Sequence, residues 1–491
     1  MTLASGTRVK VKLTRERTPG TKPAGVGTAT TNVAVDKTGA AAGFARITDG
    51  ASGFVTKGYY PGQWVKTAGF TTTANNGWWR VISVAAGTLT VADVNDAMAD
   101  EVADVSQSVQ ISMQSLRLIE RNPEGAKETL QSEEVRSTRQ IKDLRHGFNS
   151  VGGTLSGELS LKNFDDLIEL AMAAAFAWEQ PDTGATTLTA GTGSAGTGTF
   201  SRGSGSFITD GFRPGDIVQS SGFSTSENNG TWRVLTVAAT LLTVYDPTDA
   251  ITGEAGGGDE RVQLIGERCD IGQTLAAFFV ERSYEDIGIH ERSSGVALNQ
   301  MTVRVEPRRI VNIAFDLIGM SFERPSTSSE QNSAVNKATY GSSPFSAFEG
   351  QLFEGASLVA VVTSFNVQVA NNRSLEGVVG SKYSPDVFEG DSVVTGEMVS
   401  FVQDEVLMAK FYDEEESSLW CKLDDIDGSN FVNFVLPRIK YTGKGTNPPQ
   451  RGPVPNSMPF QALETDANST SGGTIETCFS IQRSNLRSED S

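Results

Sequence analysis

The sequence predicts a mainly β protein with two tandem sandwich or barrel domains, each with one flanking helix, and two small inserted all-β modules. Three observations lead to this prediction: a β-rich segment occurs twice, turn residues are abundant, and clear helix patterns are short. The 491 residues are enough for about three domains, or more if some are small. Glycine accounts for 51 of them, which suits a chain with many tight turns.

The repeated segment runs from Ser52 to Val91 and again from Gly205 to Val244, with about half of the positions identical. Pro-Gly pairs and Asn-Asn-Gly triplets return at the same places in both copies, between short runs of β-forming residues. These residues supply the backbone angles that tight turns and hairpins require. We therefore predict two inserted β modules, residues 30–110 and residues 183–265.

A weaker repeat relates the remaining parts of the chain. An alternating strand pattern over 154–160 precedes a helix pattern over 163–172, for which Asn163 is the expected N-cap and two aspartates occupy the first turn. Far downstream, a strand pattern over 393–400 precedes a helix pattern over 402–411. The dipeptide Gly-Glu occurs at the same point of both strands, and further β runs follow both helices.

Domain boundaries follow from these repeats and from a Ser-rich stretch that lacks periodicity. The expected division is a first domain made of 1–29, 111–182 and 266–324, an exposed connector at 325–350, and a second domain at 351–491. Both modules then interrupt the first domain, and the second domain is the same unit without insertions.

The charge and the cysteine content limit the classes of protein to which the chain can belong. A net charge of −18 argues against a protein that grips nucleic acid, because such affinity comes mostly from Lys and Arg. Acidity either keeps the protein soluble or prevents DNA from sticking to a conduit, and composition does not choose between them. Cys269, Cys421 and Cys478 lack metal-ligand spacing and are expected to be reduced. With no signal peptide or membrane-length apolar run, we expect assembly in the cytoplasm.

Catalytic and cofactor motifs are not evident, so we predict no enzyme, no cofactor and no metal. The acidic stretch Leu423–Asn430 lacks the full spacing of a calcium loop, and Asp427-Gly428 between two β runs favours a hairpin turn. A glycosidase needs only two carboxylates, but nothing in the sequence indicates a cleft.

Several segments in order along the chain resemble the tail tube (major tail) proteins of long-tailed, siphovirus-type bacteriophages. The resemblance covers both halves but not the modules or the connector. The segments are Thr14–Gly20, Ser115–Leu118, Lys127–Thr129, Ser132–Gln140, Phe164–Leu167, Arg282–Gly288, Leu436–Tyr441 and Pro459–Leu463.

The resemblance implies a structural virion protein of β-sandwich fold whose sheets join into rings. Stacked rings form the tail tube, which holds the tape-measure protein and then passes DNA without binding it specifically. Two such domains in one chain imply a trimeric ring with pseudo-sixfold symmetry. Tail terminator and baseplate or tip proteins are the expected partners at the two ends, in the virion tail and without membrane insertion.

Candidate contact residues follow from charge and exposure. Ring stacking is expected to involve the N-terminal segment Thr2–Pro19 and the loop 133–145, whose mixed charges suit salt-sensitive packing. The candidates are Arg15, Arg17, Glu133, Glu134, Arg136, Arg139 and Arg145. The modules are expected to project outward, where Trp64 and Trp78 are candidate glycan contacts. The alternative function is a surface-decoration protein or adhesin whose repeated modules bind cell-surface glycans.

Overall fold

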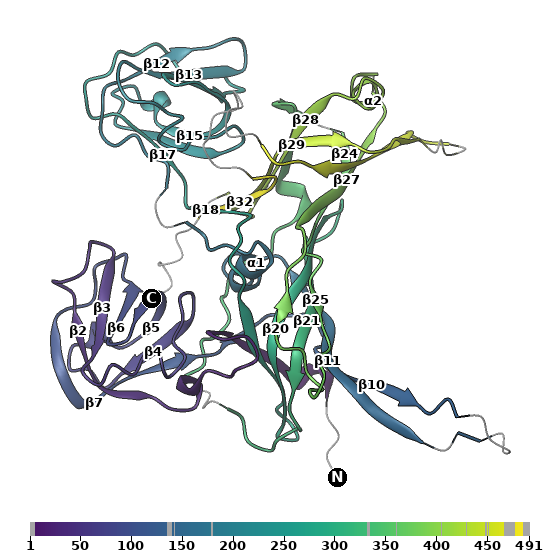
Figure 1. Ribbon diagram of the computed structural model, residues 1–491. Helices are drawn as coiled ribbons and strands as arrows, with labels where there is room; N and C mark the ends of the chain where they lie inside the picture. The colour runs from purple at the N-terminus through teal and green to yellow at the C-terminus, as the bar shows by residue number, and fades with distance from the viewer. Residues whose placement is uncertain are drawn as a thin grey trace.

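The computed structural model describes residues 5–134, 140–141, 143–177, 180–330, 334–359, 361–403, 405–428, 430–446, 449, 451–465 and 477–484. In this part of the chain the structure contains 32 β-strands and two α-helices, α1 (Asp165–Ala171) and α2 (Val406–Tyr412), so the predicted mainly β class is confirmed (Figure 1). Short 3-10 helices lie at Gly6–Arg8, Ala24–Val26, Thr73–Asn75, Ser226–Asn228 and Ala347–Glu349.

Two structural units form the body of the molecule. Domain 1 consists of β1 (Val9–Glu16), β8 (Gln114–Ser115), β9 (Glu120–Arg121), β10 (Glu124–Gln131), β11 (Leu144–Glu158), β19 (Ala277–Tyr284), β20 (Ile289–Val305) and β21 (Asn312–Phe322). Domain 2 consists of β22 (Gly350–Glu354), β23 (Ser357–Leu358), β24 (Val362–Ala370), β27 (Val393–Phe401), β28 (Glu416–Asp424), β29 (Phe431–Tyr441), β30 (Gly445–Thr446) and β31 (Pro455–Ala462).

The two domains share one strand order. In domain 1 the antiparallel neighbours run β1–β19–β20–β21–β11, with β9 and β10 beyond β11. In domain 2 they run β22–β28–β29–β31–β27–β24. Each helix follows the corresponding strand, α1 after β11 and α2 after β27. The chain therefore contains the same fold twice in tandem.

The repeated Gly-Glu pair has a steric reason. A Cβ atom on Gly157 would lie 2.6 Å from the Phe164 ring, and one on Gly396 would lie 2.5 Å from the Phe460 ring. Both glycines face the core of their domain at the place where an aromatic side chain meets the backbone. Any larger residue there would displace a core ring, so glycine is required in both strands.

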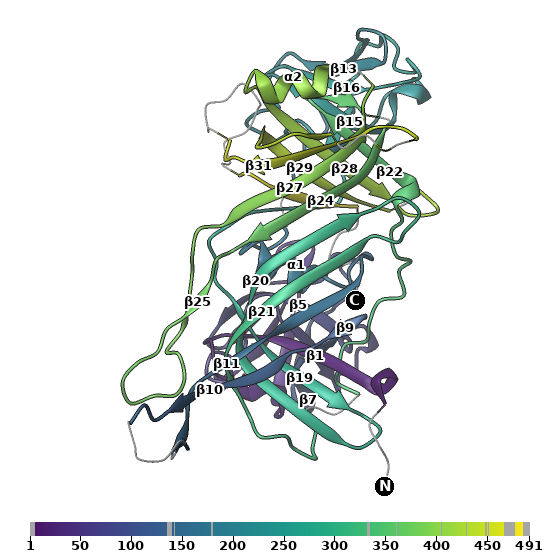
Figure 2. The ribbon, with the colours of Figure 1, turned by 90° about the vertical axis from the view of Figure 1, so that its right-hand side faces the viewer.

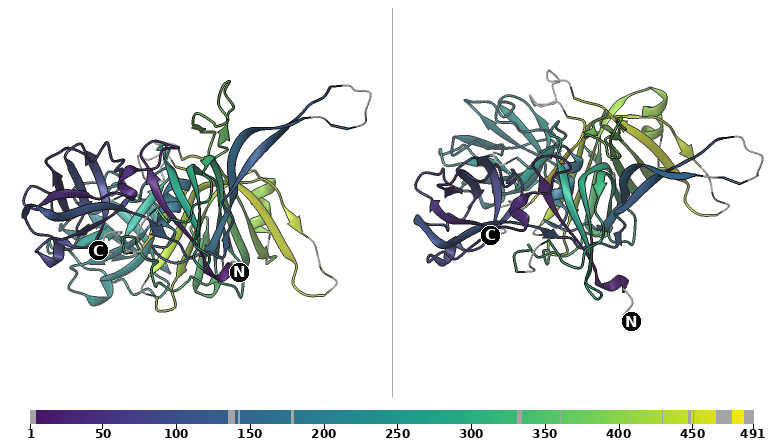
Figure 3. Two further views of the ribbon diagram at one scale, coloured as in Figure 1. Left: turned by 90° about the horizontal axis from the view of Figure 1, so that it is seen from below. Right: turned by 60° about the horizontal axis from the view of Figure 1, so that its bottom comes forward.

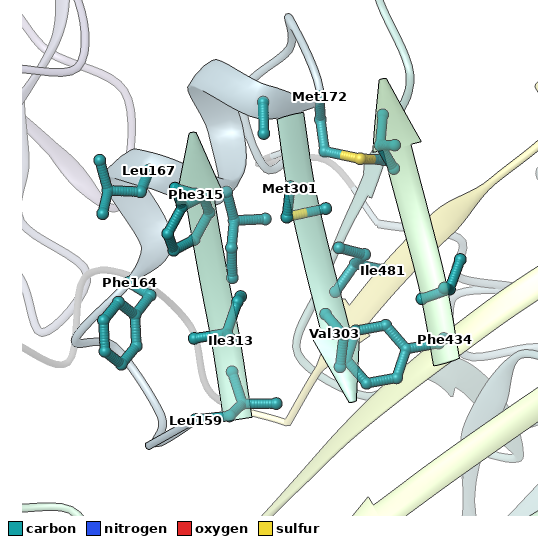
Figure 4. Packing of buried hydrophobic residues seen from close by; sticks show 14 of the residues in the cluster. Leu159, Phe164, Leu167, Met172, Met301, Val303, Ile313, Phe315, Phe434 and Ile481 are labelled. Carbon is teal, nitrogen blue, oxygen red and sulfur yellow. The ribbon is translucent and has the colours of Figure 1, made fainter. Parts of the chain in front are cut away.

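One hydrogen-bond ladder joins the domains into a single sheet. β24 of domain 2 pairs with β20 of domain 1 over six residue pairs, from Gln300↔Ala370 to Val305↔Phe365 (Figure 2). A second link is the pairing of β18 (Glu267–Asp270) with β32 (Ser480–Arg483) near the C-terminus. Buried side chains from both domains form one apolar cluster across this junction, with Met301 and Val303 of β20 beside Phe434 and Ile481 (Figure 4).

The two repeated segments fold as modules of the same topology. In the first, strands close into a barrel in the order β2-β3-β6-β5-β4-β7, and in the second the sheet order is β12-β13-β16-β15-β14-β17. The first comprises β2 (Thr30–Asp36), β3 (Phe44–Asp49), β4 (Trp64–Ala68), β5 (Trp78–Ala85), β6 (Thr88–Ala92) and β7 (Glu101–Ser112). The second comprises β12 (Leu188–Thr192), β13 (Thr197–Arg202), β14 (Ile217–Ser221), β15 (Gly230–Val237), β16 (Leu241–Tyr245) and β17 (Arg261–Leu264).

The turn residues of the repeat make the same hydrogen bonds in both modules. The Asn76 amide accepts from the backbone N–H of Phe70 at 2.9 Å and donates back to its carbonyl at 2.8 Å. The Asn229 amide makes the same two hydrogen bonds to the backbone of Phe223, at the same distances. The second asparagine of each Asn-Asn-Gly triplet thus fixes the turn by replacing a backbone partner.

The predicted helices and connector need three corrections. Asn163 is not the N-cap of α1, because that position is Phe164 and the Asn163 side chain instead donates to Ser160 and accepts from the Tyr340 N–H. The second helix begins at Val406 rather than at 402. The connector is not uniformly exposed, because Phe345 is buried against domain 1. Its backbone N–H donates to the Leu159 carbonyl, and its carbonyl accepts from the Val311 N–H.

A buried carboxyl group closes the turn that follows β1. Glu16 Oε2 accepts the N–H of Gly20 at 2.7 Å and that of Gly295 at 2.9 Å, whereas Oε1 is buried without a hydrogen-bond partner among the described residues. Burial outweighs these two bonds and raises the pKa of Glu16 to about 7.

This carboxyl group should make stability depend on pH. Because its folded-state pKa lies above the ordinary value, the stabilisation is complete below about pH 4.5 and is lost as the pH rises through about 7. We expect the unfolding free energy of the wild type to fall relative to Glu16→Gln by roughly 3 kcal/mol between pH 4 and pH 9. Parallel urea unfolding curves at several pH values measure the difference, and a constant difference would contradict the assignment.

Candidate functional site: the polar face of an eight-stranded sheet

Eight strands follow one another in a single antiparallel series through the centre of the molecule. The order is β10–β11–β21–β20–β24–β27–β31–β29, four strands from each domain. Because side chains alternate between the faces of a strand, each strand divides into a core-facing set and an opposite set. The core-facing set is buried and apolar and includes Leu155, Met301, Phe315, Val367, Met398 and Phe460.

The opposite face is mostly polar and open to solvent, except where Leu375 and Val387 of the loop 371–392 cover Ala297, Ile318 and Met320. Its residues are mostly half-exposed hydroxyl, amide and charged side chains. They are Thr154, Ser156 and Glu158 on β11; Asn312, Ala314 and Asp316 on β21; Gln300, Thr302 and Arg304 on β20; Asn366 and Gln368 on β24; Thr395, Glu397 and Val399 on β27; Ser457, Pro459 and Gln461 on β31; and Lys440 on β29.

Polar groups on this face bond to one another across the strands. Thr154 Oγ1 donates to Asp316 Oδ1 at 2.9 Å, and Ser457 Oγ donates to Glu397. The charged members named above are three acids and two bases, and none of the members is aromatic. A surface of this kind offers neither the basic cluster that holds phosphates nor the rings on which bases stack.

The rest of the molecule lies behind this face. Both modules lie on the α1 side of the long sheet, whereas the β10–β11 hairpin and the hairpin that follows β29 project to the opposite side (Figures 1 and 3). The polar face is therefore flanked by two projecting hairpins and is left uncovered by the modules.

The two modules contact the body through the same arginine position of the repeat, but each on a different surface. Arg80 of the first module pairs with Asp166 and Glu169 of α1, and the Arg15 guanidinium pairs with the same two acids. The equivalent Arg233 of the second module donates to Asn433 Oδ1 at 3.2 Å, on β29 of domain 2. Burial lowers the pKa of Arg80 and that of Arg233 to about 10. Asp166 lies in the first turn of α1, as the sequence predicts, but its two arginine partners lie far away in the chain and leave no local signal.

The predicted ring-stacking residues do not form one surface. Arg15 is buried inside β1, which pairs with β19 along its whole length, so its side chain is not exposed for a contact between rings. The role of the segment Thr2–Pro19 in ring stacking stays a prediction. Arg17 is exposed and donates to the Tyr59 carbonyl at 3.1 Å. Glu133, Glu134 and Arg145 lie exposed at the end of the β10–β11 hairpin. Arg136 and Arg139 lie outside the described residues.

The two candidate glycan contacts hold the connector instead of facing solvent. Trp64 is buried, with the Lys337 ammonium 4.6 Å from its ring centroid, so its prediction as a glycan contact is wrong. Trp78 is half-buried; its indole N–H donates to the Val335 carbonyl at 3.1 Å, and Lys66 lies 3.4 Å from its ring centroid. A role for Trp78 in glycan binding stays a prediction.

The remaining candidates concern the acidic loop, metal sites and membrane-spanning helices. Asp425 and Asn430 exchange backbone and side-chain hydrogen bonds around the tight turn between β28 and β29, so the predicted hairpin turn is confirmed. No three His, Cys, Asp or Glu side chains gather as a metal site among the described residues. No helix in the described part of the chain has the length and apolar character needed to cross a membrane.

A long sheet with one apolar and one polar face, carried on two tandem copies of one β fold, is the architecture of a structural wall. The sequence pattern of the phage tail tube protein family matches residues 6–462, and the chain belongs to that family. It is thus a structural component of a phage tail, from a non-enzymatic family that associates into a tube. A search of curated proteins finds no match to the chain.

The two module contacts predict different costs of substitution. Arg80→Met leaves two buried carboxylates with one arginine and should lower the unfolding free energy by about 3–5 kcal/mol. The matched change Arg233→Met removes hydrogen bonds to two neutral acceptors, the Asn433 amide and the Gly215 carbonyl, and should cost about 1–2 kcal/mol. Adding Asp166→Asn to Arg80→Met should recover part of the loss. Equal costs for the two arginine variants in denaturant unfolding would argue against the buried ion cluster.

Proposed function

We propose that three copies of this chain form a ring, and that stacked rings form the tail tube with the polar face toward the lumen. The single observation that carries the proposal is the continuous eight-stranded sheet, polar on one face and built from two equivalent units. Three chains supply six such units, which gives the pseudo-sixfold ring. Joining the sheets end to end would also cover the free edge of β10 and the short part of β29 beyond Lys440 with which β28 does not pair.

The chemistry of the polar face suits a conduit. DNA and the tape-measure protein must pass along the lumen without being held, and a wall of hydroxyls, amides and balanced charges provides few strong contacts for either. The net charge of −18 adds a general repulsion of phosphate. We infer that the lumen contacts DNA without specific binding, and that terminator and tip proteins cap the ends of the tube.

The modules then lie on the outside of the tube. They sit behind α1, on the side away from the polar face, and a bulky module cannot occupy a lumen that must stay open. The alternative of an adhesin is less supported, because one of the two tryptophans proposed to bind glycans is buried against the connector.

We propose that the end of the β10–β11 hairpin makes the stacking contacts between rings. Glu133, Glu134 and Arg145 are exposed there, and mixed charges on such a projection suit a salt-sensitive contact. The described structure supports no such role for β1, whose removal would expose the core of domain 1.

Electron microscopy and mass measurement of the assembled protein test the ring. We expect hollow rings or tubes whose smallest closed unit has the mass of three 52.3 kDa chains and whose image shows six similar lobes. Rings that contain six full chains would exclude the trimeric arrangement. A protein that stays monomeric at all concentrations, even when supplied with purified tail-tip complex, would contradict the tube function itself.

Cysteine accessibility tests which face lines the lumen. In a Cys478→Ser background, Thr302→Cys places a thiol on the polar face and Glu227→Cys places one on the exposed surface of the second module. A bulky polyethylene glycol maleimide should modify both variants before assembly. In tubes we expect modification at residue 302 to fall at least about tenfold while residue 227 still reacts. Equal labelling of both positions in tubes would place the polar face outside.

A further inference from the structure

The last loop of each inserted module carries a pair of aspartates in the same backbone frame. Asp93 and Asp96 follow β6 in the first module, and Asp246 and Asp249 follow β16 in the second. In both loops the first aspartate is buried and the second is exposed. The backbone N–H of the second donates to the carbonyl of the first, at 2.9 Å in one module and 3.1 Å in the other.

The side chains of these aspartates are also held by equivalent backbone groups. Asp96 Oδ1 accepts the N–H of Gly43 at 2.9 Å, and Asp249 Oδ1 accepts the N–H of Gly196 at 2.7 Å. The buried aspartate of each loop accepts the N–H of the residue five positions further on, at 3.1 Å and 2.8 Å. The two modules therefore hold both carboxyl groups in matching positions.

In the first module a cation lies between the two carboxyl groups. The Lys37 ammonium lies 3.2 Å from Asp93 Oδ2, bonds to Asp96 Oδ1 and donates to the Phe44 carbonyl at 2.6 Å. Desolvation acts to lower the pKa of Lys37, but its bonds to Asp96 and Asp93 outweigh that effect and raise the pKa above its ordinary value. Two carboxylate oxygens and one carbonyl oxygen thus form a site for a positive charge.

The second module has no lysine at this place. The last residue of β2 pairs with Arg46, and Gly191 of β12 pairs with Thr199, the equivalent of Arg46 in the repeat. The residues that come next along the chain, Lys37 and Thr192, therefore occupy equivalent positions. A threonine side chain carries no charge, so the second module keeps the oxygen atoms of the site without the cation that the first module supplies.

The three oxygen atoms of the second module are Asp246 Oδ2, Asp249 Oδ1 and the Thr197 carbonyl. Thr197 corresponds to Phe44, since each lies opposite the residue that precedes the first aspartate of its loop. Asp246 is only 1% exposed, and within the described ranges no lysine or arginine forms an ion pair with it or with Asp249. A buried carboxylate beside a second one is costly unless a cation compensates the charge.

We infer that the second module binds a calcium ion between Asp246, Asp249 and the Thr197 carbonyl, in the place that the Lys37 ammonium takes in the first module. Carboxylate and carbonyl oxygens are the ligands that Ca²⁺ prefers, and water completes its shell of six to eight oxygens. Mg²⁺ suits the site less, because it demands octahedral geometry and gives up its waters reluctantly. Two carboxylates at the surface indicate a dissociation constant of about 10⁻⁴–10⁻³ M. The site is independent of the proposed ring.

Hydrogen exchange of the full chain tests the site, with Ca²⁺ as the only added ligand. Amide exchange through local opening of residues 246–251 should slow by about elevenfold at a Ca²⁺ concentration of ten times the dissociation constant. The matching residues 93–98 of the first module are the internal control and should not respond, because Lys37 already supplies the charge. Equal slowing in both loops would show only general screening of an acidic surface and would overturn the inference.

Three substitutions separate a metal site from a structural loop. Asp249→Asn should weaken the Ca²⁺ response at least about tenfold and should still fold, since asparagine tolerates the φ of 50° at this position. Thr192→Lys should slow exchange of residues 246–251 without Ca²⁺ and abolish the response. Lys37→Thr should transfer a Ca²⁺ response to residues 93–98. No protection of residues 246–251 up to about 10 mM Ca²⁺, or protection that Asp249→Asn leaves unchanged, would contradict the site and leave the tube function untouched.

Discussion

The pairing of β20 with β24 is the constraint on which the rest of the structure depends. These six residue pairs turn two folded units into one sheet, so that the apolar side chains of both units share a single core. A ladder of this kind leaves no hinge between the domains, because backbone hydrogen bonds and buried side chains cross the junction together. The domains are therefore held in one orientation, which a repeating ring requires.

In the continuous sheet, neighbouring residues of one strand also point to opposite faces, so that an apolar side chain in the core alternates with a polar side chain on the other face. Along β20, for example, Met301 and Val303 enter the core while Thr302 and Arg304 point to the polar face. A shift of one residue at the junction would exchange these sets, so the register is enforced by the cost of burying polar groups. Because of this alternation, the apolar face of the sheet stabilises the fold, and the polar face is the one proposed to line the lumen.

The two modules show how one small fold attaches to different surfaces. Their internal turn bonds are the same, and equivalent arginines carry both attachments, yet Arg80 meets two carboxylates while Arg233 meets an amide and lies 4.7 Å from the Phe353 ring centroid. Attachment therefore depends on the receiving surface more than on the module. The second module lies within the sequence of domain 1 but rests on domain 2, which links the domains a further time.

The sequence by itself determined the β class, the duplicated module, the two strand–helix units and the family, because turn residues, alternation and helix periodicity act over a few neighbouring residues. Only the tertiary structure decided which charges are surface contacts: Arg15 and Asp166 look exposed in sequence, but distant segments bring them together and bury them as a pair. The same holds for Trp64, which is covered by a connector more than 250 residues away. The polar face also needed the structure, since alternation marks two sides of a strand without saying which side meets a neighbour.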